Sequence, residues 1–315
     1  MIKTICCFIM LLASSAVLHT TSAQTHDIKV TLLGTGCPPP VMSRFGPSIL
    51  VEAGDKKLLF DAGRGAMQRL MQVGIKWQDV QGVFFTHLHS DHVVGFPDLW
   101  LTGWLVAPGR SLPLRVWGPR GTTDMISHIE KAFAYDVYIR ESDEHASPEG
   151  ARIIATDVEE GVVYDDGGVK VTAFEVEHGP VKPAFGYRID YGKRSVVLSG
   201  DTSFSENLIQ HARGVDLLVH EVIAPDTLRT LGIPPEALKA IVARHTTPEK
   251  AAEVFNATKP RLAVYSHIAN PTASEQDILP PTRRSYSGPL ELGEDLMVIN
   301  VGEKVTVRRP RNSKE

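Results

Sequence analysis

The sequence predicts a layered α/β (α+β) sandwich, and two observations lead to this fold class. Short apolar runs bounded by turn-forming residues alternate along the chain with a smaller number of amphipathic stretches. The strands come first in clusters and then mix with helices, which favours a layered sandwich over a simple parallel doubly wound sheet. The 315 residues, of which 43% are hydrophobic, allow one large domain or two small ones with a sizeable core.

The strands are expected at apolar runs rich in branched residues. These runs are Lys29–Leu33, Ile49–Glu52, Leu58–Phe60, Val83–Phe85, Leu114–Trp117, Val169–Phe174, Ser195–Leu198, Leu217–Val219, Leu262–Tyr265 and Leu296–Val301. Apolar stripes predict two helices, at residues 66–71 and 208–212, each followed by a glycine. A third helix is expected to start at Thr247-Pro248-Glu249, with Thr247 as the N-cap, and to run to about Ala257.

The N-terminus resembles a secretory signal rather than part of the fold. Lys3 precedes a mostly apolar run from Ile5 to Leu18, and Thr21-Ser22-Ala23 offers small residues for cleavage. We therefore expect a cleaved signal peptide at residues 1–23, one hydrolase domain at 24–315, and a periplasmic or secreted protein. The run is too short and polar for a stable membrane span. An uncleaved anchor or a frayed N-terminus is the alternative.

The cysteine content and the net charge limit which disulfides and which partners can be expected. Cys6 and Cys7 lie in the predicted signal, so Cys37 alone remains and no intramolecular disulfide is expected. Cys37 is either a small buried residue or a ligand or nucleophile. The net charge of −4 gives no general attraction to nucleic acid, although it leaves a local basic patch open.

The stretch His87-Leu88-His89-Ser90-Asp91-His92 carries the strongest chemical signal in the chain. Three imidazoles and a carboxylate follow directly after the apolar run Val83-Phe84-Phe85-Thr86. Imidazole and carboxylate are the ligands that zinc prefers where water must also bind. Two adjacent divalent metals can generate a hydroxide nucleophile and bind a transferring phosphoryl group. The stretch therefore predicts half of a dinuclear metal site.

Three further polar residues follow predicted strands in the same layout. They are His178, Asp201 and His267. Side chains at one edge of a sandwich can converge although they are far apart in sequence. A carboxylate can offer one oxygen to each of two cations, so Asp201 is the candidate bridge. Asp61, at another strand end, either orients a metal-binding histidine or forms a turn.

This residue set resembles the metallo-β-lactamase superfamily of dinuclear metallohydrolases, over nearly the whole chain after residue 29. The resemblance implies a four-layer αβ/βα sandwich, in which two mixed β-sheets are flanked by helices. It also implies two zinc ions at one edge, with manganese or iron as alternatives. The implied ligands are His87, His89 and His178 for the first metal, Asp91, His92 and His267 for the second, and Asp201 as the bridge.

Neighbouring motifs resemble the ribonuclease Z-like branch, and arylsulfatases and cyclic-nucleotide phosphodiesterases share many of them. These motifs are Leu59–Gly63, Pro183–Arg188, Ser199–Thr202, His220-Glu221 and His245–Thr247. The resemblance implies attack by a metal-bound hydroxide that Asp91 orients or deprotonates. It further implies that His245, assisted by Glu221, protonates the leaving oxygen as a general acid.

Two departures from ribonuclease Z shape the expected substrate. The long tRNA-gripping insertion is missing between Arg188 and Ser199, and the predicted signal separates the protein from precursor tRNA. We therefore expect a small-molecule ester substrate, either a phosphodiester or an aryl sulfate, with nucleic acid and tRNA 3′ processing disfavoured. The alternatives are a lactonase or β-lactamase-like hydrolase and a non-catalytic, metal-stabilised binding protein. The sequence leaves homodimer formation open.

Overall fold

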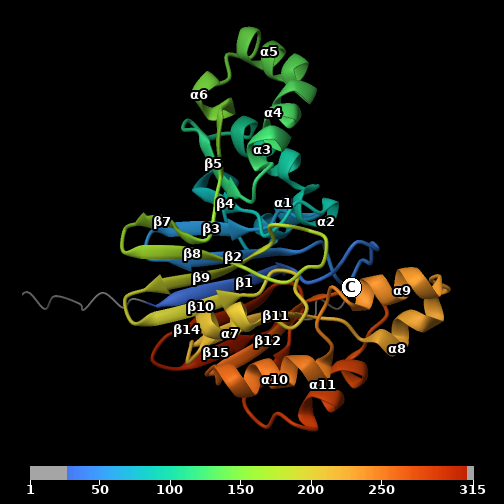
Figure 1. Cartoon of the computed structure of the whole chain (residues 1–315). Coiled ribbons are helices and arrows are strands. Elements are labelled where there is room, and N and C mark those ends of the chain that lie inside the picture. Colours follow the sequence, from blue (N-terminus) through green and yellow to red (C-terminus); the bar gives the residue numbers. More distant parts are fainter. Residues whose placement is uncertain (1–26, 311–315) are drawn as a thin grey trace, which may run out of the picture.

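Two mixed β-sheets stacked face to face form the centre of the molecule (Figure 1). The computed structural model describes residues 27–310. In spatial order, the first sheet contains β15 (Val305–Arg308), β14 (Met297–Val301), β1 (Ile28–Gly34), β2 (Ser48–Ala53), β3 (Lys56–Phe60), β4 (Gly82–Phe84), β5 (Leu114–Gly118) and β6 (Ile153–Asp157). The second contains β13 (Leu290–Leu292), β12 (Leu262–Ile268), β11 (Leu217–Val222), β10 (Arg194–Leu198), β9 (Phe185–Tyr191), β8 (Val169–Glu175) and β7 (Gly161–Asp166).

Helices flank the two sheets (Figure 1). In the first half of the chain these are α1 (Ala66–Gln72), α2 (Ser90–Val93), α3 (Phe96–Leu105), α4 (Thr122–Ala132), α5 (Ala134–Ser142) and α6 (Pro148–Ala151). In the second half they are α7 (Glu206–Ala212), α8 (Pro225–Leu228), α9 (Pro235–Val242), α10 (Pro248–Thr258) and α11 (Glu275–Arg283). Two short 3-10 turns are η1 (Trp77–Asp79) and η2 (Arg229–Leu231).

Aromatic side chains fill the space between the two sheets. The Phe84 ring stacks on Trp117 with centroids 4.7 Å apart and on Phe60 at 4.9 Å. Tyr187, from the opposite sheet, meets Phe84 edge to face at 5.7 Å. Its hydroxyl donates a 2.8 Å hydrogen bond to the carbonyl of Phe85. Burying each such ring stabilises the fold by roughly 1.5–3 kcal/mol, and the Tyr187 bond ties the second sheet to the end of β4.

Two outer apolar layers complete the fold. On the first sheet, Leu59 and Phe85 pack with helical residues that include Leu70 and Trp100. On the second, Val197 and residues of β11 and β12 pack with buried side chains of α7, α10 and α11. The order helix, sheet, sheet, helix confirms the predicted four-layer αβ/βα sandwich.

Each of the ten predicted strands overlaps a strand of the structure, and α1, α7 and α10 occupy the predicted helix positions. The hydroxyl of Thr247 accepts a hydrogen bond from the Lys250 N–H, which is the expected N-cap contact. β9 and β10 form a tight antiparallel hairpin, so only a short turn at residues 192–193 separates them. Helices α3 to α6, in the part of the molecule at the top of Figure 1, were not predicted.

Strand direction explains where a site forms. β3, β4 and β5 run parallel in the first sheet, and β10, β11 and β12 run parallel in the second. The carboxyl ends of β4, β8, β10 and β12 lead into the segments that carry the predicted ligands. Because these ends meet at one edge of the sandwich, ligands far apart in sequence come together there.

Between residues 27 and 310, no helix combines the length and the apolar character that crossing a membrane requires. The predicted signal segment, residues 1–23, lies outside the described residues, and so it stays a prediction.

Candidate metal centre

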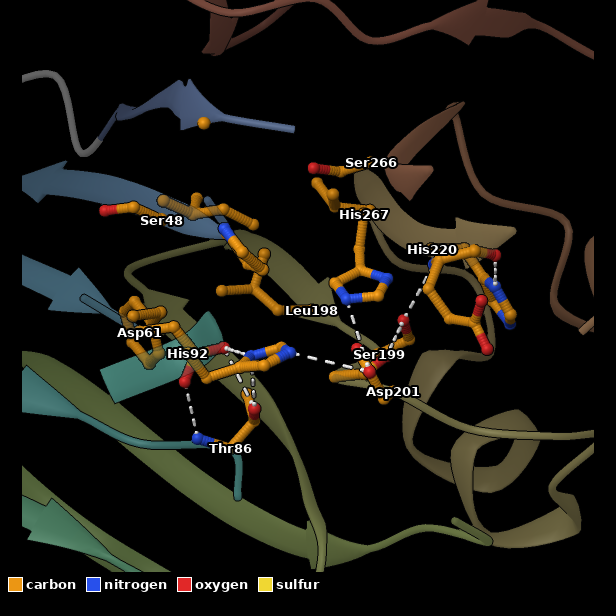
Figure 2. Close-up of a pocket in the computed structure, with 17 residues that line it drawn as sticks. Ser48, Asp61, Thr86, His92, Leu198, Ser199, Asp201, His220, Ser266 and His267 are labelled. Atoms are coloured by element: carbon orange, nitrogen blue, oxygen red, sulfur yellow. Dashed lines mark hydrogen bonds and ion pairs between the residues drawn. The ribbon is translucent and has the colours of Figure 1, made fainter. Parts of the chain in front are cut away.

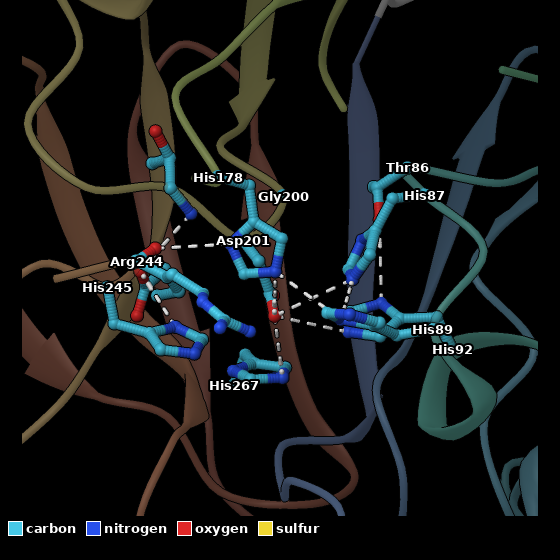
Figure 3. A network of polar contacts seen from close by, with 12 residues as sticks. Thr86, His87, His89, His92, His178, Gly200, Asp201, Arg244, His245 and His267 are labelled. Carbon is cyan, nitrogen blue, oxygen red and sulfur yellow. Dashed lines mark hydrogen bonds and ion pairs between the residues drawn. The ribbon is translucent and has the colours of Figure 1, made fainter. Parts of the chain in front are cut away.

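The seven predicted metal ligands lie together at this edge of the sandwich. Figure 3 labels all of them except Asp91. They come from the segment between β4 and α2, from α2 itself, from the loops after β8 and β10, and from β12. The seven are His87, His89, Asp91, His92, His178, Asp201 and His267. All except the half-buried His89 are buried, which places the donor atoms where water competes poorly with a cation.

The ligand atoms form groups small enough to hold a metal ion, each group spanning no more than 4.8 Å. One group is His87, His89, His178 and Asp201, and a second is Asp91, His92 and His267. Oδ2 of Asp201 lies 3.3 Å from Nε2 of His267 and 3.5 Å from Nε2 of His92. The same oxygen lies 3.9 Å from Nε2 of both His87 and His178. Asp201 therefore faces both groups, as a bridging carboxylate must.

Hydrogen bonds at Nδ1 set the tautomers of two histidines. Nδ1 of His178 lies 3.1 Å from the Arg244 carbonyl, which can only accept, so Nδ1 carries the proton. Nδ1 of His87 lies 3.1 Å from Oγ1 of Thr86, whose proton goes to a carboxylate, so His87 is the donor in that contact. In both rings the lone pair is left on Nε2, the atom that faces the cluster.

Asp61 holds His92 and the segment that carries residues 87–92 in position. Its Oδ2 lies 2.8 Å from Nδ1 of His92 and accepts a 2.9 Å bond from the Thr86 hydroxyl (Figure 2). Its Oδ1 accepts a 2.8 Å bond from the Thr86 N–H. Asp61 adopts a left-handed backbone conformation, with φ of 59°, which marks a position that the surroundings hold in place. Of the two alternatives for Asp61, the structure supports orientation of a metal-binding histidine.

The donor set fits divalent cations. The buried polar atoms without a hydrogen-bond partner in residues 27–310 include one atom from each of four ligands: Nε2 of His92, Nε2 of His267, Oδ2 of Asp91 and Oδ1 of Asp201. An unsatisfied buried polar group costs roughly 1–3 kcal/mol. Cations bound by these nitrogens and oxygens would satisfy all four, and such an N/O set suits zinc, manganese or iron.

Burial and neighbouring charges shift the pKa values of the imidazoles in different directions. Burial, with the charge of His92, holds the pKa of His87 well below its ordinary value. Burial also lowers the pKa of His178, to about 4. Burial alone would lower the pKa of His92 too, but the Asp201 and Asp61 carboxylates raise it well above normal. A proton and a metal exclude each other on Nε2 of His92, so metal binding there must release a proton.

His245 and Glu221 lie directly beside this cluster. Oε1 of Glu221 lies 3.2 Å from Nδ1 of His245 and accepts hydrogen bonds from the N–H groups of Thr202 and Thr246. The His245 ring is 5.3 Å from His178 between centroids. Burial lowers the pKa of His245, but the Glu221 carboxylate outweighs it and raises the pKa to about 9. His245 is thus held as an imidazolium at neutral pH.

Cys37 lies near the centre, but its environment does not suit a nucleophile. The thiol is free and 4% exposed. Burial, together with the charges of Asp91 and Asp201, raises its pKa to about 12. A thiol with this pKa is protonated at neutral pH and reacts slowly.

Thr86 and Arg244 orient histidines of the cluster, and the sequence did not predict either role. Both roles depend on tertiary contacts, which leave no pattern in the sequence.

Comparison with known proteins identifies the family. The β-lactamase superfamily domain matches residues 56–268. Ribonuclease Z of Mycobacterium sp. strain KMS is 34% identical over 283 residues, covering 89% of this chain and 99% of that protein. Ribonuclease Z of Mycobacterium avium strain 104 is 37% identical over 283 residues, covering 87% of this chain and 98% of that protein.

Solved structures give the same fold. The short form of human tRNase Z matches with a TM-score of 0.63 at 26% identity, covering 87% of this chain and 99% of that one. The metallo-β-lactamase fold protein YhfI from Bacillus subtilis matches with a TM-score of 0.68, covering 87% and 99%. At 16% identity, the likeness to YhfI concerns the fold alone.

These relatives correct the expected substrate. The expectation of a small-molecule ester, with nucleic acid disfavoured, is contradicted by relatives that are named as ribonucleases and match along almost their whole length. Net charge averages over the whole chain and says little about the surface around the site. The short β9–β10 turn removes one segment only, while the similarity covers 87–89% of the chain. The chain therefore belongs to the metallo-β-lactamase superfamily, with relatives in its ribonuclease Z branch.

Proposed function

We propose that this chain is a metal-dependent phosphodiesterase that cleaves RNA, as the names of its relatives indicate. The observation that carries the proposal is the His245–Glu221 pair beside a full set of histidine and aspartate ligands. A pair of divalent cations in such a set withdraws charge from a phosphoryl oxygen and acidifies water. The chain's own side chains then have to hold the metals, position the water and protonate the leaving group.

Two zinc ions are the proposed cofactors, with manganese or iron as alternatives that the same donors accept. The first group of ligands is His87, His89 and His178, the second is Asp91, His92 and His267, and Asp201 lies between them. The carboxylate of Asp201 would reduce the repulsion between the two cations, because its Oδ2 faces histidines of both ligand groups.

Asp91 is proposed to orient the attacking water. Its Oδ2 lies 3.5 Å from Nε2 of His267 and 3.6 Å from Nε2 of His92, and it has no hydrogen-bond partner within residues 27–310. A carboxylate oxygen in this position can accept a proton from water held within the cluster. Asp91 would therefore serve both as a ligand and as the base that aligns the nucleophile.

His245 is proposed as the general acid. Because Glu221 engages Nδ1, Nε2 is the nitrogen left to donate a proton to the leaving oxygen. The ribose oxygen that leaves when RNA is cleaved is a poor leaving group, so protonation accelerates its departure. Glu221 is itself held by the N–H groups of Thr202 and Thr246, so it fixes both the orientation and the charge of His245.

A substrate panel tests this proposal. Metal-replete protein would be assayed with a tRNA bearing a 3′ extension, an unstructured RNA, bis(p-nitrophenyl) phosphate, p-nitrophenyl sulfate and the β-lactam nitrocefin. We expect cleavage of RNA and of the phosphodiester, and loss of both when His245→Asn or Asp201→Ala is introduced. The products of RNA cleavage, analysed by mass spectrometry, locate the bond that breaks.

Three outcomes would overturn the proposal. Turnover of nitrocefin without turnover of phosphodiesters would indicate an amide hydrolase, and turnover of the sulfate alone would indicate a sulfatase. Fewer than about two metals per chain after zinc loading, with no hydrolysis of any substrate, would indicate a metal-stabilised binding protein.

We also propose that residues 1–23 are a signal peptide that directs the hydrolase domain, residues 24–315, out of the cytoplasm. The proposal rests on the charged start, the apolar run and the small residues before residue 24. N-terminal sequencing of the protein from its native cells tests it. A mature chain that begins near Gln24 is expected, and one that retains Met1 or Ile2 would refute it.

A further inference from the structure

Arg244 places a cation next to the candidate metal centre, and its guanidinium has no partner in the part of the chain that the structure describes. It directly precedes His245, and its side chain is half-buried. Within residues 27–310, its guanidinium forms no hydrogen bond or ion pair. Its hydrogen bonds are made by the backbone, since the N–H donates to the Ile241 carbonyl and the carbonyl accepts from His178. Arg44, by contrast, has protein partners, because its Nη1 donates a 2.6 Å hydrogen bond to the Thr35 hydroxyl and a 2.8 Å bond to the Gly293 carbonyl.

The stem of Arg244 is held against the loop that carries His178. A Cβ atom added at Gly179 would lie 2.9 Å from Cγ and 3.5 Å from Cδ of Arg244, so the stem occupies the space that glycine leaves free. Gly179 also has a φ of 63°, which favours glycine. Close packing of the stem restricts the directions in which the guanidinium can point.

The guanidinium is directed toward the ligand cluster rather than into bulk solvent. Figure 3 shows the side chain leaving the backbone between His178 and His245 and pointing toward the centre of the cluster. Burial lowers the pKa of His89, and the charge of Arg244 adds to that effect, which indicates that the guanidinium lies within electrostatic range of the site.

The Arg244 guanidinium cannot bind a metal ion, because both are positively charged. Its planar fork of donors matches the oxygens of a phosphate or carboxylate. The proposed substrate carries one negative charge on the phosphodiester group that is cleaved, while neutral esters and lactones carry none. Arg244 thus has a physical reason to discriminate between these substrate classes.

We propose that Arg244 is a substrate-binding residue that donates hydrogen bonds to a non-bridging oxygen of the phosphodiester and thereby favours anionic substrates. This inference rests on the proposed function, since it assumes that a phosphodiester reaches the site. The bound phosphate would lie between the guanidinium on one side and the metal ligands on the other.

Three variants separate this role from a structural one. Arg244→Met removes the charge but retains the apolar stem and the backbone carbonyl that orients His178. Arg244→Lys retains the positive charge but lacks the planar fork of guanidinium donors. Lys239→Met, at an exposed position of the neighbouring helix α9, is the matched control for loss of a positive charge.

The measurements are kcat/KM for bis(p-nitrophenyl) phosphate, the Kd of inorganic phosphate by calorimetry, and metal content. We expect Arg244→Met to lower kcat/KM about 10- to 100-fold, as expected for the loss of a hydrogen bond to a charged group. Phosphate should bind more weakly by a similar factor, with metal content unchanged. For Arg244→Lys, kcat/KM and phosphate affinity should lie between those of the parent protein and those of Arg244→Met. For Lys239→Met, both should stay within about twofold of the parent protein.

Phosphate affinity within about threefold of the parent protein in Arg244→Met would overturn the inference, and so would loss of metal in that variant. If the parent protein cleaves no phosphodiester, the proposed function fails. The calorimetric comparison still tests Arg244 in that case, because inorganic phosphate carries the same oxygens.

Discussion

The Asp61 carboxylate and the His92 imidazole form a direct contact, with Oδ2 of Asp61 2.8 Å from Nδ1 of His92. Asp61 also accepts both the N–H and the hydroxyl hydrogen of Thr86, and the Thr86 oxygen in turn accepts from Nδ1 of His87. One carboxylate therefore orients imidazoles that belong to the two different ligand groups. Metal affinity at both groups should depend on this residue, although Asp61 belongs to neither group itself.

The first prediction follows from this contact. Asp61→Asn keeps the size of the side chain, but its neutral amide cannot accept from Thr86 and His92 at the same two oxygens. Metal affinity should fall about 10- to 100-fold, which is typical for residues that orient metal ligands. Titration with a competing chelator measures the change. The exposed Asp165→Asn, which removes the same charge away from the site, is the control, and equal affinities in the two variants would contradict the prediction.

The second prediction concerns pH. Burial lowers the pKa of His245, and the Glu221 carboxylate raises it to about 9, so the general acid should be protonated below that pH and lost above it. Glu221→Gln keeps an oxygen for the Thr202 and Thr246 N–H groups but removes the charge. The pKa of His245 should then fall toward or below its ordinary value of 6.5. The alkaline limb of kcat/KM should accordingly move to lower pH.

A dinucleoside phosphate is the substrate for this measurement, because its alkoxide leaving group needs a proton. Bis(p-nitrophenyl) phosphate is the internal control, since its leaving group is already stable as an anion and should respond weakly. An alkaline limb that stays near pH 9 in Glu221→Gln would show that His245 is not the acid.

The third prediction concerns metal removal. Without cations, the buried carboxylates of Asp91 and Asp201 both lie within 3.6 Å of Nε2 of His92, and polar atoms of four ligands stay unsatisfied. Metal at about 100 times its Kd stabilises the folded chain by roughly 2.7 kcal/mol. Chelation should therefore lower the Tm by roughly 5 °C or more in scanning calorimetry. Asp201→Ala should show no further drop with chelator, and an unchanged Tm in the parent protein would contradict a bound metal.

Much of the sandwich could be predicted because buried strands are short, continuous and apolar. The edge strands could not, since β6 and β15 alternate between half-buried and exposed residues and β13 has only three residues. α11 was missed because Pro280 and Pro281 lie inside it, although Ser274 and Asp277 form a capping box at its start. α5 has no buried residue, and so its pattern carries no core-facing stripe.

The ligand set could be predicted because the ligands lie at the end of an apolar strand or in the segment after it, and strand ends meet at one edge. The residues that orient the ligands could not. Thr86 and Arg244 act through a hydroxyl and a backbone carbonyl, and neither leaves a pattern in the sequence. The substrate expectation was wrong, because a missing insertion, a predicted signal segment and a net charge of −4 say less about the substrate than similarity to ribonuclease Z along 89% of the chain.

The last prediction tests how the second sheet supports the site. The Tyr187 hydroxyl donates a 2.8 Å bond to the Phe85 carbonyl, one residue before Thr86 and two before His87. Tyr187→Phe keeps the aromatic contacts with Phe84 but leaves that buried carbonyl without this donor. Unfolding free energy should fall by roughly 1–3 kcal/mol, measured by urea denaturation of the metal-replete protein. Tyr138→Phe, on exposed α5, should change it by less than about 0.5 kcal/mol. Equal stability of the two variants would show that this bond between the sheets does not support the ligand loop.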